Sequence, residues 1–541
     1  MTRAIINIPD DATVVEAPHR VEEVAAGCLP LQRQGSFGKK EGGVGSQNTK
    51  MTQHYQKKKN SFNEGTLVSQ GSGEFSKVSK LGACRVRLSA MATRPKNRIR
   101  LFVEDMLKHA PDCHPATGEP LPARMNLSLG DPTALGLQPP REATDALVSV
   151  ASDSSMSGLT TKEVHGYQHS LGNPRFREAI RTHALQGTGI AGVDDIFVTS
   201  GCSQALQFAL LTLCTDGESN VLIPSPCFPL YNTLCEFVGA EARGYQLNPS
   251  ASWEARMEDL EKQCDAKTAC LLVCNPGNPT SHAYSADHLE QLLKFAYRKR
   301  IPVVADEVYA HMTFDLEGEG EGADNGAHSN GKAAGKARFQ YMAEVAFERL
   351  GRERPPILSC SALSKRFLVP GWRLGWLSLY DDAFESLKQA GVKDGVAALC
   401  QIGMTPSSIT QAAAPAILAN TPDQYHADLR ATIKRGAKYC VERCRQCPGL
   451  DCVYEPQGAM YFMPRVDAKA FAGKLGGENP KGESADIVWT KALLAERNVF
   501  MLPGTLFGAP DFARIVTAAP REVLCEAWDR IESFCREKLG Q

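Results

Sequence analysis

Lys365 and Arg373 are the residues of this sequence that first suggest chemistry. Lys365 follows the apolar run PPILS (355–359), and a lysine held in a cleft at the end of a strand can attack an aldehyde. Arg373 comes eight residues later, after the turn-forming pair Pro370 and Gly371, and its guanidinium can bind a phosphate group beside the lysine. Most lysines are solvated surface groups, so the prediction of a reactive amine depends on this pair.

A carboxylate and two possible hydrogen-bond donors follow other apolar runs. Asp306 ends the run IPVVAD (301–306), where it is either the N-cap of a helix or a buried carboxylate that keeps a pyridine nitrogen protonated. Tyr309, three residues later, can donate to the phenolic oxygen of the same ring. Asn278, in NPGNPT (275–280), is either a turn residue or a second donor to that oxygen. Spacing alone leaves these alternatives open.

The segment VTSGCSQALQFALL (198–211) has the pattern of a strand, a turn of small residues and an apolar helix. The backbone N–H groups of Gly201, Cys202 and Ser203 would face a phosphate at the helix start, where the helix dipole also favours an anion. Phe228, in PSPCFPLY (224–231), is either a core residue or a flat ring that stacks on a pyridine.

Arg514 lies within the apolar run FARIVTAA (512–519), which predicts that its side chain is buried. Burying an unpaired guanidinium is costly, so Arg514 must meet a carboxylate. That partner is either a structural Asp or Glu or the carboxylate of a ligand, and this run of residues favours neither.

Four cysteines lie between residues 440 and 452, and Cys444 and Cys447 form a CxxC pair. A zinc site requires a second ligand pair at a suitable spacing. Cys440 and Cys444 are one helical turn apart and Cys447 precedes Pro-Gly, so we interpret these residues as core thiols at a helix end and expect no metal.

The elements that must position these residues follow a regular order. Short apolar runs rich in β-branched residues alternate with amphipathic stretches such as DHLEQLLKFAYRK (287–299). Strands that are apolar on both faces and separated by helices are typical of a parallel sheet covered on each side. The sequence therefore predicts an α/β fold with a mostly parallel central sheet flanked by helices, and a helix near PKNRIRLFVEDMLKHA (95–110).

Changes in composition predict how the chain is divided. Residues 1–83 are rich in Gly, Ser, Gln and Lys and are expected to be disordered. We expect an N-terminal arm and helix over 84–130, belonging to a small domain, a large domain over 131–400 and a smaller α+β domain over 401–541. Within the large domain, 315–338 is a low-complexity insertion.

Length and charge exclude several classes of protein. The chain has 541 residues, with 60 Lys and Arg against 61 Asp and Glu, a net charge of −1 that argues against nucleic-acid and membrane-surface binding. A mean hydropathy of −0.26 and the lack of an apolar run of roughly 18 residues argue against a membrane span. The 18 cysteines lie singly among apolar residues, as reduced thiols do, and the N-terminal segment is too acidic for a typical transit peptide, so we expect a cytoplasmic protein.

The ordered series of these stretches resembles the pyridoxal-phosphate-dependent aminotransferases of fold type I, and within them the tyrosine aminotransferase branch. The resemblance covers the chain from about residue 95 to its end and rests on the following segments: NLSLGDPT (126–133), HGYQHSLGNP (165–174), TSGCSQA (199–205), PSPCFPLY (224–231), TACLLVCNPGNPT (268–280), ADEVY (305–309), LSKRFLVPGWRLGW (363–376), PQGAMYFM (456–463) and RIVTAAP (514–520).

The resemblance implies a role for each residue around the cofactor ring. Lys365 would form the Schiff base with pyridoxal 5'-phosphate and shuttle the α-proton, and Asp306 would pair with the pyridine nitrogen. Asn278 and Tyr309 would hydrogen-bond the phenolic oxygen, and Phe228 would stack on the ring.

The resemblance also implies how the phosphate and the substrate are held. Arg373, the backbone at 201–203 and, with less support, Ser361 would bind the phosphate, and Tyr167 would reach it from the other subunit of a homodimer. Arg514 would bind the α-carboxylate of the substrate, with Gly130 and Asn278 beside it.

The implied reaction is the transfer of an amino group from an L-amino acid, with tyrosine or another aromatic donor expected, to a 2-oxo acid such as 2-oxoglutarate, by ping-pong kinetics. Alternatives are an alanine-type or broad-range aminotransferase, which NPGNPT with ADEVY also fits, and a carbon–sulfur lyase on the same scaffold. One departure from the family pattern is Ser281, which stands where glycine is common after NPT.

Overall fold

The computed structural model describes the chain in five stretches, residues 88–152, 158–190, 192–316, 339–475 and 482–541. The predicted disorder of 1–83 and nearly all of the predicted insertion at 315–338 lie outside the described residues.

The β-branched runs form the strands of one eight-stranded sheet. Its order is β2 (Ile196–Thr199), β9 (Gly375–Tyr380), β8 (Ile357–Ala362), β7 (Val303–Asp306), β6 (Thr268–Cys274), β3 (Asn220–Ser225), β4 (Glu241–Asn248) and β5 (Glu254–Ala255). The five neighbours from β8 to β4 pair in parallel, whereas β9 runs antiparallel to both β2 and β8, and β5 runs antiparallel to β4. In the pairing of β7 with β8, Asp306 lies opposite Cys360.

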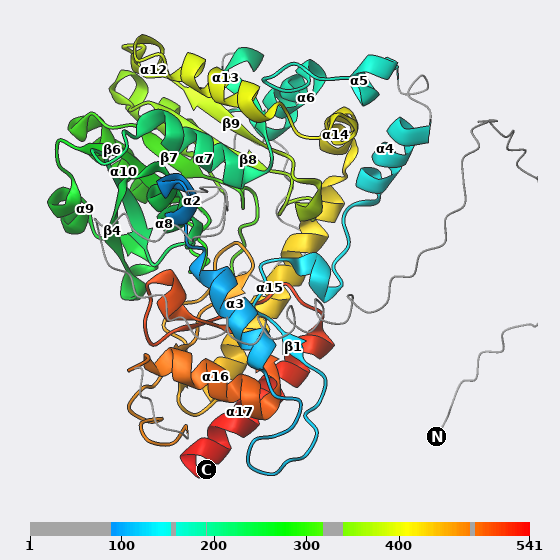
Figure 1. Cartoon of the computed structure of the whole chain (residues 1–541), viewed down its shortest axis with the longest axis vertical. Helices are drawn as coiled ribbons and strands as arrows, with labels where there is room; N and C mark the ends of the chain where they lie inside the picture. The colour runs from blue at the N-terminus through cyan, green and yellow to red at the C-terminus, as the bar shows by residue number, and fades with distance from the viewer. Residues whose placement is uncertain (1–87, 153–157, 191, 317–338, 476–481) are drawn as a thin grey trace, which may run out of the picture. The chain divides into compact units, whose positions relative to one another are not determined.

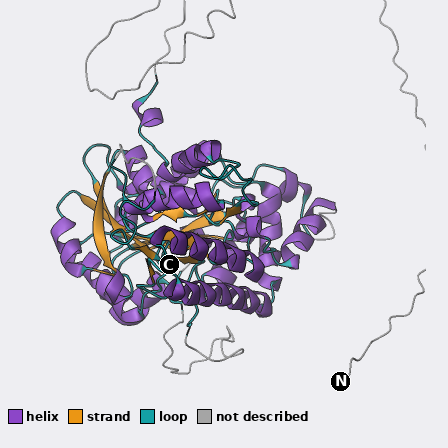
Figure 2. Cartoon of the chain, turned by 90° about the horizontal axis from the view of Figure 1, so that it is seen from below, coloured by secondary structure: helices purple, strands orange, loops and turns teal. Residues whose placement is uncertain are grey.

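Helices cover both faces of this sheet, as the doubly apolar strands require (Figure 2). Within β6, Cys270 and Leu272 pack toward one face, against helices α7 (Cys202–Leu213), α8 (Leu230–Val238) and α13 (Val392–Gly403). Leu271 and Val273 pack toward the other face, against α9 (Met257–Gln263), α10 (Ala286–Lys299) and α11 (Met342–Val345).

A further group of helices packs around α14 (Ser408–Asn420), which contacts α4 (Arg141–Ser152), α5 (Thr161–His165) and α6 (Pro174–Ala179). The two remaining short helices are α2 (Ala90–Thr93) and α12 (Ser386–Gln389).

The C-terminal part of the chain is helical with short strands between the helices. Its helices α15 (Asp423–Gln446), α16 (Ala485–Arg497) and α17 (Arg521–Leu539) enclose a shared apolar core (Figure 1). Three small sheets join the short strands: β11 (Tyr461–Phe462) and β14 (Leu502–Pro503) flank β15 (Ala513–Val516), β1 (Met125–Asn126) pairs with β13 (Val499–Phe500), and β10 (Leu450–Asp451) pairs with β12 (Arg465–Val466).

The helix predicted near residue 95 is α3 (Arg98–His109), which begins after Asn97, whose side chain accepts a hydrogen bond from the Arg100 backbone. Its apolar side packs against Leu494, Phe500 and Leu502 of the C-terminal part. The predicted α/β fold class is confirmed; the domain boundaries at 130 and 400 stay predictions. Within the described stretches, no helix is both long and apolar enough to cross a membrane.

Candidate active site

A cavity of about 250 Å³ opens at the carboxyl ends of the parallel strands, and we call it the central cavity. Parallel strands present the loops that follow them at the same sheet edge, so residues distant in sequence meet there. Ten of the residues singled out from the sequence line this cavity: Gly130, Cys202, Ser203, Phe228, Asn278, Asp306, Tyr309, Lys365, Arg373 and Arg514.

Lys365 enters the central cavity from the turn that follows β8. Its Nζ donates a hydrogen bond of 2.5 Å to the backbone oxygen of Gly130. The amine is therefore held on the side where residues 128–130 pass, and it remains within the cavity lining. The catalytic role of Lys365 stays a prediction.

Asp306 is the last residue of β7 and is only 4% exposed. Its Oδ2 accepts a 2.7 Å bond from the hydroxyl of Tyr231, and its Oδ1 accepts a 3.4 Å bond from Sγ of Cys202 and one of 3.2 Å from the backbone N–H of Val308. Burial raises the pKa of Asp306, although these donors and the nearby Lys365 oppose the rise. A cationic N–H in the cavity would stabilise the charged carboxylate.

Arg373 and the start of α7 form one end of the central cavity. The guanidinium donates to the backbone oxygens of Ser200, at 2.9 Å, and Pro370, at 3.2 Å. Gly201 is the residue before α7 and has φ +75°, and a Cβ there would lie 2.7 Å from Nη2 of Arg373. The backbone conformation therefore favours glycine, and an added Cβ would displace the guanidinium from its present position. The combined positive charge and helix N-terminus suit a phosphate.

Arg514 lies in β15 and is 3% exposed. It donates a 2.9 Å bond to Oδ1 of Asn278 and a 2.6 Å bond to the backbone oxygen of Ser128. Its Nε has no hydrogen-bond partner, and among the described residues no carboxylate pairs with it. Burial lowers the pKa of Arg514. Of the two partners left open by the sequence, a ligand carboxylate is the one that this arrangement favours.

Tyr309 and Asn278 lie in the lining of the same cavity. The hydroxyl of Tyr309 is 2.7 Å from the hydroxyl of Tyr461, and burial raises the pKa of Tyr309 well above its usual range. Asn278 is engaged through its oxygen with Arg514, which leaves its amide N–H₂ available to the cavity.

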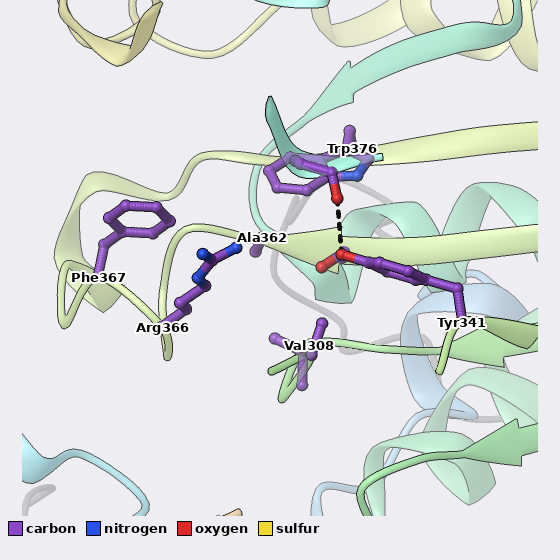
Figure 3. Close-up of a pocket in the computed structure, with 9 residues that line it drawn as sticks. Val308, Tyr341, Ala362, Arg366, Phe367 and Trp376 are labelled. Atoms are coloured by element: carbon purple, nitrogen blue, oxygen red, sulfur yellow. Dashed lines mark hydrogen bonds between the residues drawn. The ribbon is translucent and has the colours of Figure 1, made fainter. Parts of the chain in front are cut away.

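Three predicted residues do not line the central cavity. Gly201 lies beneath Arg373, and Tyr167 is 83% exposed on the protomer surface. Ser361 is buried and donates a 3.2 Å bond to the backbone oxygen of Glu307. It lines a separate space of about 10 Å³, with Trp376 and Arg366, whose side chain points toward Ala362 (Figure 3).

Glu307 follows Asp306 and is fully enclosed next to that small space. Its carboxylate accepts bonds from Oγ of Ser359, at 2.5 Å, and from the backbone N–H of Met342, at 2.7 Å. Burial raises the pKa of Glu307 to about 7, and these two bonds only partly oppose the rise.

Two tyrosines were missed by the sequence reasoning. Tyr231 is fully buried in α8 and donates to Asp306, and Tyr461 of β11 contacts both Tyr309 and Arg514. A phenol that is buried in an apolar helix face needs a hydrogen-bond acceptor. The segment PSPCFPLY therefore did contain a signal for Tyr231. No comparable signal exists for Tyr461, because its contacts depend on two long-range pairings: that of β11 with β15, which carries Arg514, and the bridge between Thr313 and Gly458.

Ser281 adopts φ +55°, a left-handed conformation that favours glycine. Ser281 therefore has the backbone conformation that a glycine would adopt at this position, and it adds a side chain. Its Oγ accepts a 3.1 Å bond from the backbone N–H of Tyr461.

Three of the four cysteines between 440 and 452 are the core thiols that the sequence predicts, whereas Cys452 is half-buried. Cys440, Cys444 and Cys447 are buried in the apolar core of α15, α16 and α17, with Trp489 and Trp528. Burial raises the pKa of Cys440 to about 12, as expected of a core thiol.

Comparison with known proteins agrees with this geometry. The model of the family described as aminotransferase class I and II matches residues 122–531. The chain is 35% identical over 454 residues to the tyrosine aminotransferases of Mus musculus and Homo sapiens, covering 84% of this chain and 88% of each relative.

Solved structures give the same result. A tyrosine aminotransferase from Leishmania infantum is similar with a TM-score of 0.68 at 27% identity, covering 84% of this chain and 99% of that one. An alanine aminotransferase from Pyrococcus furiosus is similar with a TM-score of 0.68 at 26% identity, covering 83% and 100%.

Proposed function

The chain belongs to the class I and II aminotransferases, and from that premise we propose that it transfers the amino group of an aromatic L-amino acid such as tyrosine to a 2-oxo acid such as 2-oxoglutarate, with pyridoxal 5'-phosphate as cofactor. The observation that carries the proposal is the buried, carboxylate-free Arg514 in the same cavity as Lys365. The cavity thus holds an amine, Lys365, for the chemistry at the amino group and a separate cation, Arg514, that can bind the carboxylate of an amino acid.

The residues present fit the cofactor. Asp306 would hold the ring nitrogen, Tyr309 and Asn278 would donate to the phenolic oxygen, and Arg373 with the start of α7 would hold the phosphate. The cradle below the phosphate is formed by Gly201, where a Cβ would collide with the guanidinium. When bound, pyridoxal 5'-phosphate supplies an aldehyde that carries the amino group and a ring that accepts the electron pair released at the α-carbon.

The chain's own residues perform the remaining work. Arg514 binds the α-carboxylate through a guanidinium whose direction is fixed by Asn278 and Ser128. Lys365 takes the proton from the α-carbon and later returns one, since its Nζ is held within the lining of the same cavity. Asp306 keeps the ring nitrogen protonated, and its burial among Tyr231, Cys202 and Val308 makes a cationic partner favourable.

An aromatic donor is supported by the rest of the cavity lining. Beside the polar Ser128 and Ser364, it includes an apolar wall that comes from several elements: Ile99 and Val103 of α3, Leu129, Leu206, Leu230 and Leu502. Such a wall favours an apolar or aromatic side chain over a charged one. The names of the tyrosine aminotransferase relatives support the same class.

We further propose a homodimer in which Tyr167 reaches the phosphate of the partner subunit. The side chain is 83% exposed in the protomer, which leaves it available for a contact of this kind.

The test is a donor and acceptor panel with the purified holoenzyme. Tyrosine and phenylalanine with 2-oxoglutarate should give glutamate at a higher kcat/KM than alanine or aspartate. A clear preference for alanine would contradict the aromatic assignment. Release of ammonia from a cysteine conjugate without glutamate would identify a carbon–sulfur lyase instead.

A further inference from the structure

Tyr461 lines the central cavity and contacts two residues of the proposed machinery, Tyr309 and Arg514. It is 1% exposed, and its hydroxyl is 2.7 Å from that of Tyr309. The centre of its ring is 4.3 Å from the guanidinium carbon of Arg514. A Cβ built on Gly130 would lie within 2.3 Å of the Tyr461 hydroxyl, so the backbone that receives Lys365 passes directly beside it.

The hydroxyl pair has a preferred direction. Each phenol has one proton to donate, and in the proposed function Tyr309 donates its hydrogen bond to the cofactor oxygen. The proton between the two tyrosines is then donated by Tyr461 to the oxygen of Tyr309. A hydroxyl that accepts a hydrogen bond becomes a stronger donor, because successive bonds polarise one another in a buried site.

The ring of Tyr461 acts on Arg514 in a different way. The guanidinium carbon lies over the ring of Tyr461 and also over the ring of Phe507, 4.6 Å from its centre. Aromatic faces attract a desolvated cation. Together with the bonds that Nη1 and Nη2 donate to Asn278 and Ser128, the two rings restrict the orientation in which Arg514 can receive a carboxylate.

Ser281 fixes the segment that carries Tyr461. Its Oγ accepts from the backbone N–H of Tyr461, and its backbone oxygen accepts from those of Gln457, at 2.9 Å, and Gly458, at 3.0 Å. Ser281 does so from a left-handed conformation that glycine would adopt more easily. Glycine would remove the Oγ and leave the Tyr461 N–H without this buried partner.

We propose that Tyr461 is a positioning residue that sets both the donor strength of Tyr309 and the orientation of Arg514, and that Ser281 supports it. This inference rests on the proposed function. It predicts that the hydroxyl and the ring of Tyr461 have separable effects, one on the cofactor side and one on the carboxylate side.

The hydroxyl is tested with Tyr461→Phe. In the holoenzyme, the pH midpoint of the visible absorbance of the lysine-bound cofactor should move upward by about half a pH unit, since a weaker hydrogen bond to the ring oxygen lets the proton be held more tightly. Tyr309→Phe should move the midpoint in the same direction and further. KM for the amino donor should change less than about twofold, because the ring under Arg514 is retained.

The ring is tested with Tyr461→Leu. The Kd of 3-phenylpropanoate, an unreactive carboxylate, should rise about tenfold by calorimetry on the holoenzyme, and KM for the donor should rise with it. If this variant does not fold, Ser281→Ala, which removes only the Oγ that holds the Tyr461 backbone, should raise the same Kd and also move the absorbance midpoint upward.

Tyr454→Phe is the matched control, since its hydroxyl is buried without a hydrogen-bond partner and lies outside the cavity lining. It should leave the midpoint and the Kd unchanged. An unshifted midpoint in Tyr461→Phe overturns the role of the hydroxyl, and an unchanged Kd in Tyr461→Leu overturns the role of the ring. If the wild-type enzyme transfers no amino group, the proposed function fails; the midpoint and the Kd remain measurable in that case.

Discussion

The side-chain oxygen of Asn278 accepts a hydrogen bond of 2.9 Å from the guanidinium of Arg514. One residue comes from the turn after β6 and the other from β15, so this bond joins the eight-stranded sheet to the C-terminal strands. The amide assigned to the cofactor and the cation assigned to the substrate carboxylate are thereby held in one orientation.

Lys365→Ala should reduce amino transfer by about three orders of magnitude or more, because the group that moves the α-proton is lost. The purified wild-type protein should be yellow, and the variant should lose the absorbance of the lysine-bound cofactor. Borohydride treatment followed by peptide mass spectrometry should place the cofactor on the Lys365 peptide in the wild type. A label on another lysine would contradict the assignment.

Arg514→Gln should raise KM for the amino donor by roughly 10- to 100-fold, the range expected for the loss of a charged hydrogen bond in a buried site. The control is Arg465→Gln, which removes a 49% exposed guanidinium paired with Asp451 at the surface and should leave KM unchanged. Steady-state kinetics of both variants, with thermal melting to confirm folding, makes the comparison. Equal KM values in the wild type and Arg514→Gln would remove the carboxylate role.

Gly201→Ala should weaken cofactor binding by about tenfold or more. The new Cβ would lie 2.7 Å from Nη2 of Arg373, and φ +75° is strained for alanine, so the guanidinium must move from the phosphate position. Gly371→Ala, in the same loop as Arg373 with open space around the added Cβ, is the matched control. Titration of the apoenzyme with pyridoxal 5'-phosphate gives both dissociation constants, and similar values would argue against the cradle.

Glu307→Gln should change how stability depends on pH. The pKa of Glu307 is raised from 4.5 to about 7, so between these values the folded chain holds a proton that the unfolded chain releases. This group therefore stabilises the fold fully below about pH 4.5, and its contribution is lost as the pH rises through about 7. Between pH 5 and pH 8, the wild type should lose about 2 to 3 kcal/mol of unfolding free energy relative to the variant. Urea unfolding at both pH values measures this, and parallel pH profiles would contradict it.

Much of the site could be predicted from where apolar runs end. Asp306 ends a buried parallel strand, and Asn278 and Lys365 follow two others. The carboxyl ends of parallel strands lie on the same side of a sheet. The meeting of these residues could therefore be predicted without the tertiary structure. The proposed phosphate site at the start of α7 was also predictable, because a strand, a glycine turn and a helix follow one another directly in the sequence.

The remainder depends on contacts that sequence spacing does not encode. Ser361 stands near the end of β8, and only the tertiary structure shows that the backbone of Glu307 lies beside this strand and that its oxygen accepts the Ser361 hydroxyl. Tyr461 reaches Tyr309 across 152 residues of chain because the segment just before it pairs antiparallel with residues 312–314, at the bridge between Thr313 and Gly458. The proposed role of Tyr167 requires a second subunit, which one sequence does not display.

The register of β7 and β8 places Asp306 opposite Cys360, although residues 307–359 separate the two along the chain. The backbone hydrogen bonds between β7 and β8 therefore set the distance between Asp306 and the turn that bears Lys365. The length of the connection between the two strands does not affect this distance. Lengthening a connection costs only about 0.6 kcal/mol per doubling. Sequence added to this crossover away from Glu307, Tyr309 and the buried helix α11 should therefore leave the distance between Asp306 and Lys365 unchanged.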